Sequence, residues 1–237
     1  MGKIYAGTSG WAYSTWKPDF YAAKLGSAKF LGHYASRLNS VEVNYSFRSS
    51  LTKRLLKGRI GATPPGFKFA VKAHQSITHI KRLRNATGLT SKFFSSLQPL
   101  RKTRKLGPVL FQLPPFLKCD LELLKDFLER LPIHTRCAFE FRHASWFSDS
   151  VFSALQGSNV ALCLAESDAL ETPNVRTADF SYLRLRKEKY PPKSRKALAK
   201  RVNGFAKKGD VFAFFKHQEK PKGPLYAEEL LAAVENR

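Results

Sequence analysis

The sequence lacks acidic residues over a long internal stretch. No Asp or Glu occurs from residue 43 to 119, although sixteen Lys or Arg fall there. The whole chain has 41 Lys and Arg against 18 Asp and Glu, a formal net charge of +23. Residues 184–222 repeat the basic bias, and residues 120–180 reverse it with ten acids against five bases. A field polarised in this way attracts polyanions, so we expect nucleic acid or another polyanion as a partner. A merely solvated basic surface is the alternative.

The sequence also lacks the apolar runs of membrane proteins. No stretch approaches the roughly 20 apolar residues that span a bilayer, and the start, Met1 to Gly7, reads directly as a strand. The three cysteines form no C-x-x-C pair, and Cys137 and Cys163 lie in apolar segments, as buried free thiols do. We therefore expect a soluble, cytoplasmic protein with no membrane partner.

Common catalytic signatures are missing as well. The chain has no H-E-x-x-H or paired Cys/His spacing for a metal, and Gly7-Thr-Ser-Gly-Trp11 matches neither the G-x-S-x-G elbow nor the G-x-G-x-x-G turn. Residue types that bind metals do occur near predicted strand ends, namely His74, His79, His143, Glu140, Glu166 and Asp168. Without a motif, we assign no metal site, and the cofactor, including a divalent metal ion, stays open.

Strand-like and helix-like segments alternate along the chain. The spacing predicts strands at 4–9, 40–45, 67–73, 108–113, 136–141, 160–165, 181–186 and 210–215, and helices at 28–38, 121–131, 148–155, 194–208 and 225–234. Asp120 is the expected cap of the second helix. The strands are short and apolar, as strands covered on both faces are. This pattern predicts an α/β protein, a single (β/α)8 TIM barrel domain over residues 1–237 with eight parallel strands and some irregularity in its last third. A doubly wound open sheet is the alternative.

Polar residues recur at the late ends of these predicted strands. They come mostly in pairs two residues apart, which share one face of a strand: Glu42 and Asn44, Lys72 and His74, Gln112 alone, Glu140 and Arg142, Glu166 and Asp168, Arg184 and Arg186. Burying isolated charges is costly, and barrel enzymes build their active sites at this end. We therefore predict a ligand site there. The alternative is a structural ion network in which Glu42 pairs with Lys72 and Glu140 pairs with Arg142.

Several segments together resemble one known family. They are Gly7-Thr-Ser-Gly-Trp11 with Trp16 and Phe20-Tyr21, Val41-Glu-Val-Asn44 with Phe47-Arg48, Phe67 to Lys72 with Ile77-Thr-His79, Leu106 to Pro115, and Glu140 to Trp146. In this order they resemble the YecE-like family, TIM-barrel proteins that carry the label domain of unknown function 72, over about residues 4–168. The resemblance implies the barrel and no activity. It marks Glu42, Asn44, Lys72, Gln112, Glu140 and Arg142 as motif positions.

The last third departs from the family pattern. Leu185-Arg186-Lys187 stands where the family has His-Gly after its strand-seven motif, and Phe214 to Gln218 stands where it has an Asn-rich turn. Both changes add positive charge.

These residues suggest an anion site with chemistry attached. We predict catalytic roles for Glu42, Lys72, Glu140 and Arg142, and ligand-binding roles for Asn44, His74, Gln112, Arg184 and Trp11. The cations would receive a phosphate or carboxylate, the amides would orient it, and Trp11 would stack on a base or sugar.

Our hypothesis is a barrel that binds nucleic acid through its basic surfaces. At the strand ends it would act on a phosphate-bearing ligand, a phosphodiester or a nucleotide. If it is an enzyme, we expect a phosphodiester hydrolase. One alternative is a small-molecule lyase, isomerase or hydrolase on the same residues, with Lys72 forming a Schiff base or the two glutamates acting on a sugar. Another is a binding module without catalysis. The oligomeric state is not indicated.

Overall fold

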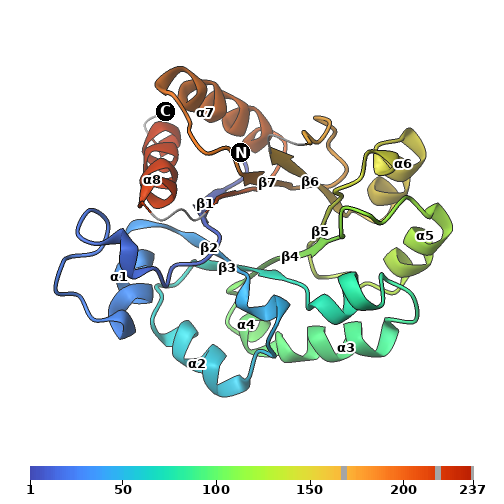
Figure 1. Cartoon of the computed structure of the whole chain (residues 1–237), viewed down its shortest axis with the longest axis horizontal. Coiled ribbons are helices and arrows are strands. Elements are labelled where there is room, and N and C mark those ends of the chain that lie inside the picture. Colours follow the sequence, from blue (N-terminus) through green and yellow to red (C-terminus); the bar gives the residue numbers. More distant parts are fainter. Residues whose placement is uncertain (167–169, 217–219, 236–237) are drawn as a thin grey trace.

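The predicted eight-stranded parallel barrel is confirmed. The computed structural model describes residues 1–166, 170–216 and 220–235. Its strands are β1 (Ile4–Thr8), β2 (Ser40–Val43), β3 (Lys68–Lys72), β4 (Leu106–Gln112), β5 (Cys137–Glu140), β6 (Ala161–Glu166), β7 (Ser181–Leu185) and β8 (Val211–Phe215). They form one sheet in the order β1-β8-β7-β6-β5-β4-β3-β2, and every ladder is parallel. The strands form a ring at the centre of the molecule with the helices outside it (Figure 1).

Helices connect most of the strands. They are α1 (Phe30–Arg37), α2 (Lys53–Gly61), α3 (Thr87–Ser96), α4 (Gln98–Lys102), α5 (Leu121–Glu129), α6 (Asp149–Gly157), α7 (Pro192–Ala206) and α8 (Lys222–Glu235). Asp120 caps α5 as predicted, because its Oδ1 accepts a hydrogen bond of 3.1 Å from the Leu123 amide. No helix in the described part of the chain is long and apolar enough to cross a bilayer. The expected irregularity lies between β6 and β7, where the described residues 170–180 contain no helix.

The barrel closes between β1 and β2 through side chains. In the described structure no ladder joins β1 to β2. One isolated bridge pairs Ser9 with Glu42 across this seam. The Asn39 amide replaces part of the missing ladder: its Oδ1 accepts from the Ala6 amide at 2.9 Å, and its Nδ2 donates to the Ile4 carbonyl at 2.9 Å. Backbone groups of β1 that would otherwise be unpaired are therefore satisfied.

A tyrosine and a glycine complete the same seam. The Tyr34 hydroxyl accepts from the Thr8 amide at 2.8 Å and donates to the Ser40 carbonyl at 3.0 Å. A Cβ atom on Gly7 would lie 1.9 Å from the Ser40 oxygen, so only glycine permits this approach. Gly7, the first residue of the Gly7-Thr-Ser-Gly-Trp11 segment, thus allows β1 and β2 to approach each other and close the barrel.

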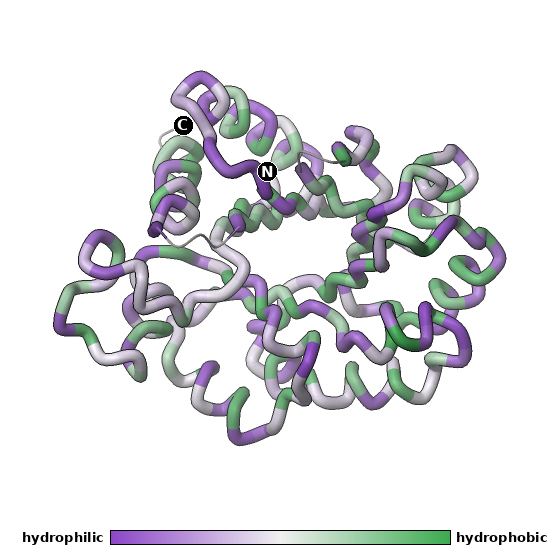
Figure 2. The backbone as a smooth tube through the Cα atoms, viewed as in Figure 1, coloured by the Kyte–Doolittle hydropathy of each residue, from purple (hydrophilic) through white to green (hydrophobic). Residues whose placement is uncertain are grey.

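The barrel interior is layered along its axis. Its apolar middle is one buried cluster formed by Tyr5, Ala70, Leu110, Ala138, Ala161, Cys163, Phe180, Tyr182, Phe212 and Phe214. A second, larger cluster fills the space between strands and helices, and apolar residues accordingly follow the central strands in Figure 2. Because alternate strand residues share a face, the inward positions on either side of the middle layer in β3 are Lys68 and Lys72. Each end of the barrel interior is therefore polar.

Candidate functional site

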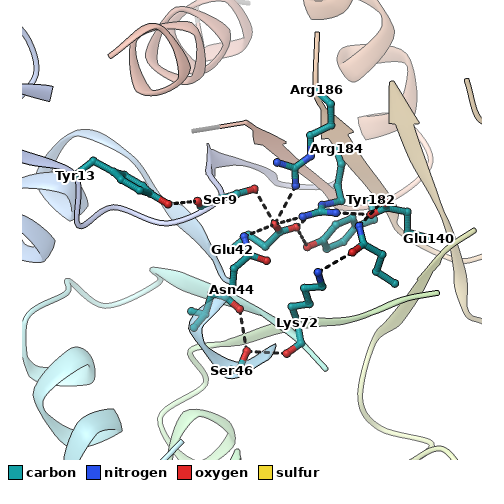
Figure 3. Close-up of polar contacts among 12 residues, drawn as sticks. Ser9, Tyr13, Glu42, Asn44, Ser46, Lys72, Glu140, Tyr182, Arg184 and Arg186 are labelled. Carbon is teal, nitrogen blue, oxygen red and sulfur yellow. Dashed lines mark hydrogen bonds and ion pairs between the residues drawn. The ribbon is translucent and has the colours of Figure 1, made fainter. Parts of the chain in front are cut away.

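A buried glutamate lies at the centre of the polar cluster at the carboxyl ends of the strands. Glu42, on β2, is 0% exposed. Its Oε1 accepts from Ser9 Oγ at 2.7 Å, and its Oε2 accepts from the Tyr182 hydroxyl at 2.8 Å (Figure 3). The Arg184 guanidinium, from β7, donates to both oxygens, through Nη2 at 2.8 Å and Nε at 2.9 Å. This two-pronged contact fixes the planes of both groups.

Arg184 joins two carboxylates from different strands. Its Nη1 contacts Oε2 of Glu140, at the end of β5, and both residues are buried, at 5% and 6% exposure. Burial alone would raise the pKa of the Glu42 and Glu140 carboxyls, but Arg184 and Arg186 hold both pKa values below the ordinary range. Both carboxylates therefore stay ionised at neutral pH, whereas a sugar hydrolase needs one that keeps its proton.

The charges are paired differently from the predicted ion network. Glu42 and Glu140 share Arg184, so the predicted pairing of Glu42 with Lys72 and of Glu140 with Arg142 is wrong. Lys72, at the end of β3, has no carboxylate partner among the described residues. The physical reason is the length of the Arg184 side chain, whose guanidinium extends into the barrel interior and hydrogen-bonds to both carboxylates.

Lys72 instead binds a neutral group. Its Nζ donates to Gln112 Oε1 at 2.7 Å and lies 4.0 Å from the centre of the Phe47 ring. Gln112, at the end of β4, in turn donates to Glu140 Oε1 at 2.7 Å. Burial, followed by the positive charge of Arg184, lowers the pKa of Lys72 to about 8. A partly deprotonated amine is therefore present at physiological pH.

Two further groups lie toward the solvent side of Glu42. Arg186 Nη2 lies 3.3 Å from Glu42 Oε1, and the Arg186 side chain is 18% exposed. Burial and the neighbouring Arg184 lower the pKa of this guanidinium. Asn44 Nδ2 donates to Glu42 Oε1 at 3.2 Å, while its Oδ1 has no hydrogen-bond partner among the residues described. Both point from the strand ends into the same cluster in Figure 3.

We call this cluster the barrel mouth. It consists of Ser9, Glu42, Asn44, Lys72, Gln112, Glu140, Tyr182, Arg184 and Arg186. Six of these nine were predicted as site residues. Ser9 and Tyr182 were missed, and Arg186 was paired with Arg184 without a site role. The strand alternation could have found Tyr182, which is two residues before Arg184 on the same face of β7.

The other predicted site residues lie outside the barrel mouth. Arg142 follows β5, is exposed, and has no hydrogen bond or ion pair to any described residue. His74 follows β3 and binds Ser76 Oγ through Nδ1 at 2.8 Å. Trp11 is half-buried, with the Arg59 guanidinium 4.9 Å from its ring centre. Asp168 falls outside the described residues.

The donor set of the barrel mouth favours an anion over a metal ion. Within the described ranges, no three His, Cys, Asp or Glu side chains gather as metal ligands. The two carboxylates that a cation would need are occupied by Arg184. Three basic side chains, Lys72, Arg184 and Arg186, face two carboxylates, so the barrel mouth carries excess positive charge.

Comparisons with known proteins agree with the fold. The family model described as "Protein of unknown function DUF72" matches residues 5–237. The chain is 34% identical over 155 residues to UPF0759 protein YunF of Bacillus subtilis, which covers 61% of this chain and 52% of that protein. It is 28% identical over 146 residues to UPF0759 protein YecE of Escherichia coli, which covers 61% and 50%. The chain thus spans about half the length of these curated relatives.

Solved structures show the same architecture. A DUF72 family protein from Thermotoga maritima superimposes with a TM-score of 0.87 and 25% identity, which covers 98% of this chain and 99% of that one. A DUF72 family protein from Enterococcus faecalis gives a TM-score of 0.80 at 17% identity, over 98% and 94%. The second resemblance concerns the fold alone.

Proposed function

This chain belongs to the DUF72 family, and we propose that its barrel mouth binds a phosphate group of a nucleotide or nucleic-acid strand, with Lys72 as the proton-transfer group. The observation that carries the proposal is the charge excess. Lys72 and Arg186 are both partly buried beside the Glu42–Glu140 carboxylate pair, and together with Arg184 these cations exceed the two carboxylates by one charge. A bound phosphate would supply the missing negative charge and accept charge-assisted hydrogen bonds from both cations.

The environment of Lys72 suits acid–base chemistry. A group transfers protons best when its pKa lies near the working pH, and the pKa of Lys72 is lowered to about 8. In phosphodiester hydrolysis, water attacks phosphorus, the P–O ester bond breaks, and the leaving oxygen needs a proton. The Lys72 ammonium can donate this proton and regain one from the attacking water. In this scheme Glu42 and Glu140 position Arg184, and the exposed Arg142 contacts the outer part of the ligand.

The distribution of charge over the chain supports an extended ligand. The acid-free residues 43–119 include the basic helices α2 and α4, and the basic residues 184–222 include α7. Phosphates along a strand could contact these basic helices while one phosphate occupies the barrel mouth. Binding of this kind releases counterions, so the affinity falls steeply as salt rises.

The test is binding and turnover with one matched pair of variants. Lys72→Met removes the proposed phosphate ligand, and Lys92→Met removes one exposed lysine of α3 as a control for net charge. Filter binding uses a 5′-phosphorylated oligothymidylate over a salt series, and hydrolysis is followed with bis(p-nitrophenyl) phosphate.

We expect wild type and Lys92→Met to bind alike near 0.1 M salt and to weaken as salt rises. Lys72→Met should bind about tenfold more weakly, which corresponds to about 1.4 kcal/mol, and should release no p-nitrophenol. No binding near 0.1 M salt, or a flat salt dependence, would remove the nucleic-acid proposal. Equal affinity of Lys72→Met and Lys92→Met would show that the barrel mouth is not the binding site.

The same lysine supports a second candidate, a small-molecule lyase, isomerase or hydrolase. A partly neutral amine can attack a carbonyl carbon and form an imine with loss of water. Borohydride reduction in the presence of a carbonyl substrate would then leave a covalent adduct on Lys72, visible by mass spectrometry and absent in Lys72→Met. If neither adduct nor phosphodiester turnover appears in wild type, the third candidate stands, a binding module in which the Glu42–Arg184–Glu140 network only stabilises the barrel.

A further inference from the structure

A charged cavity lies at the amino-terminal end of the barrel, opposite the barrel mouth. Its volume is about 330 Å³, and the residues that matter for its charge are Lys68, Arg101, Arg104, His134, Arg136 and Asp210. Lys68 begins β3, Arg136 precedes β5 and Asp210 precedes β8. The apolar middle of the barrel separates this cavity from the barrel mouth. It is therefore an independent site that the function proposed above does not use.

The strand pattern places these charges on the barrel axis. Arg136, Ala138 and Glu140 are successive inward positions of β5, and Lys68, Ala70 and Lys72 are successive inward positions of β3. Arg101, in the last turn of α4, and Arg104, in the turn after it, add two exposed guanidinium groups to the rim. Four Lys or Arg thus surround one carboxylate.

The Asp210 carboxylate already accepts hydrogen bonds from the protein itself. Asp210 Oδ2 accepts from Arg136 Nη1 at 2.7 Å, and its Oδ1 accepts from the Lys3 amide at 2.8 Å. Burial alone would raise the pKa of Asp210, but the hydrogen bonds from Arg136 and the Lys3 amide hold this pKa below its ordinary value, so the group stays ionised. One arginine is therefore neutralised, while the charges of Lys68, Arg101 and Arg104 have no acidic partner within the described structure.

The remaining cations form no ion pair with any described residue. Lys68 Nζ donates to the Arg104 carbonyl at 2.6 Å, and burial together with Arg136 lowers the pKa of this amine. The side chains of Arg101 and Arg104 form no hydrogen bond with any residue that the structure describes. Thr135, which also lines the cavity, is 9% exposed, and its hydroxyl has no partner among those residues. The cavity therefore offers charge and hydrogen-bonding capacity that the protein itself leaves unused.

We infer that this cavity binds a compact, multiply charged phosphate chain of two or three phosphates. A cavity of about 330 Å³ lies at the small end of the range for small-molecule sites, roughly 300–1,000 Å³. Three uncompensated cations match the charge of such a chain, whereas a single phosphate would leave most of them unpaired. The chain can come free in solution or as part of a nucleotide, because the recognising groups are the same.

The experiment is a calorimetric titration with inorganic tripolyphosphate at constant ionic strength. It is done in the Lys72→Met background, so that binding at the barrel mouth is weakened. Arg101→Gln with Arg104→Gln removes the rim charges. Both side chains are exposed and make no contact that the fold needs, and an unchanged melting temperature checks this. Lys24→Gln with Lys92→Gln is the matched control, since it removes two exposed charges that do not line the cavity.

We expect the Lys72→Met protein and the control to bind tripolyphosphate equally well, and the Arg101/Arg104 variant to bind about 100-fold more weakly, about tenfold for each lost contact. Equal affinity in all three proteins would overturn the inference, as would an equal loss in the control. No binding in the Lys72→Met protein, with binding in wild type, would show that only the barrel mouth takes the anion. A nucleoside triphosphate titrated in parallel distinguishes the two sources: tighter binding than tripolyphosphate indicates a nucleotide. Because this site is independent, its failure leaves the barrel mouth proposal standing.

Discussion

At the scale of single residues, the most informative side chain is Arg184. It lies at the end of β7 and forms ion pairs with one carboxylate from β2 and another from β5. Without it, Glu140 would be an uncompensated buried charge and Glu42 would keep only its longer contact with Arg186, which is expensive. Arg184 is therefore a structural requirement of the barrel mouth as well as a source of its positive field.

Replacing Arg184 with Met should destabilise the protein strongly. Removing one partner of a buried ion pair typically costs about 3–5 kcal/mol, and here Glu140 loses its ion pair while Glu42 keeps only the one with Arg186. Denaturation by urea would measure the change in the free energy of unfolding. Arg142→Met, at an exposed position without contacts to the described residues, should change it by less than about 0.5 kcal/mol. Equal effects of the two substitutions would mean that the network contributes no stability.

The lowered carboxyl pKa values predict a dependence of stability on acid. Because the pKa of Glu140 is lower in the folded protein than in the unfolded chain, the unfolded chain binds more protons as the pH falls. The stabilisation is complete above the ordinary glutamate pKa of about 4.3 and is lost as the pH falls through the folded value. Glu140→Gln cannot titrate there, so its free energy of unfolding should fall less between about pH 5 and about pH 2. Parallel curves for Glu140→Gln and wild type would contradict this, and the exposed Glu122→Gln serves as the control.

At the scale of elements, strand positions were predictable and several helices were not. All eight strands were predicted because each is an apolar run covered on both faces. The basic helix α2 has a single fully buried residue, Leu56, so its sequence shows no apolar stripe, and it was missed along with α3 and α4. The late strand ends also predicted most of the barrel mouth. The sequence could not predict the ion pairs. The partners of Arg184 depend on how far its side chain extends across the barrel, and not on distance along the sequence.

The β1–β2 seam provides a prediction for elements. Asn39→Ala removes the hydrogen-bond acceptor of the Ala6 amide and the hydrogen-bond donor to the Ile4 carbonyl. Leaving buried backbone groups unsatisfied costs about 1–3 kcal/mol, so we expect a loss of about 2 kcal/mol in the free energy of unfolding. Hydrogen exchange should accelerate at the Ala6 amide and stay slow in β5, away from the seam. Unchanged exchange at Ala6 would mean that the seam does not depend on this side chain.

At the scale of the whole molecule, the barrel has an apolar middle between two cationic ends. The carboxyl end combines Lys72, Arg184 and Arg186 with two carboxylates, and the amino end gathers Lys68, Arg101 and Arg104 around Asp210. A net charge of +23 on 237 residues makes both ends attractive to anions over long distances. We therefore propose two separate anion sites on one scaffold, the first of which contains an amine with its pKa lowered to about 8.

The most direct measurement of the central claim is the pKa of the Lys72 amine, followed by NMR of its side-chain nuclei with and without a 5′-phosphorylated oligothymidylate. This signal reports the barrel mouth alone, since anions at the other end of the barrel do not contact Lys72. A phosphate beside the amine favours its charged form, so the pKa should rise from about 8 toward the ordinary lysine value of about 10.4. A pKa that stays near 8 while the oligonucleotide is bound would place the ligand elsewhere and contradict the account.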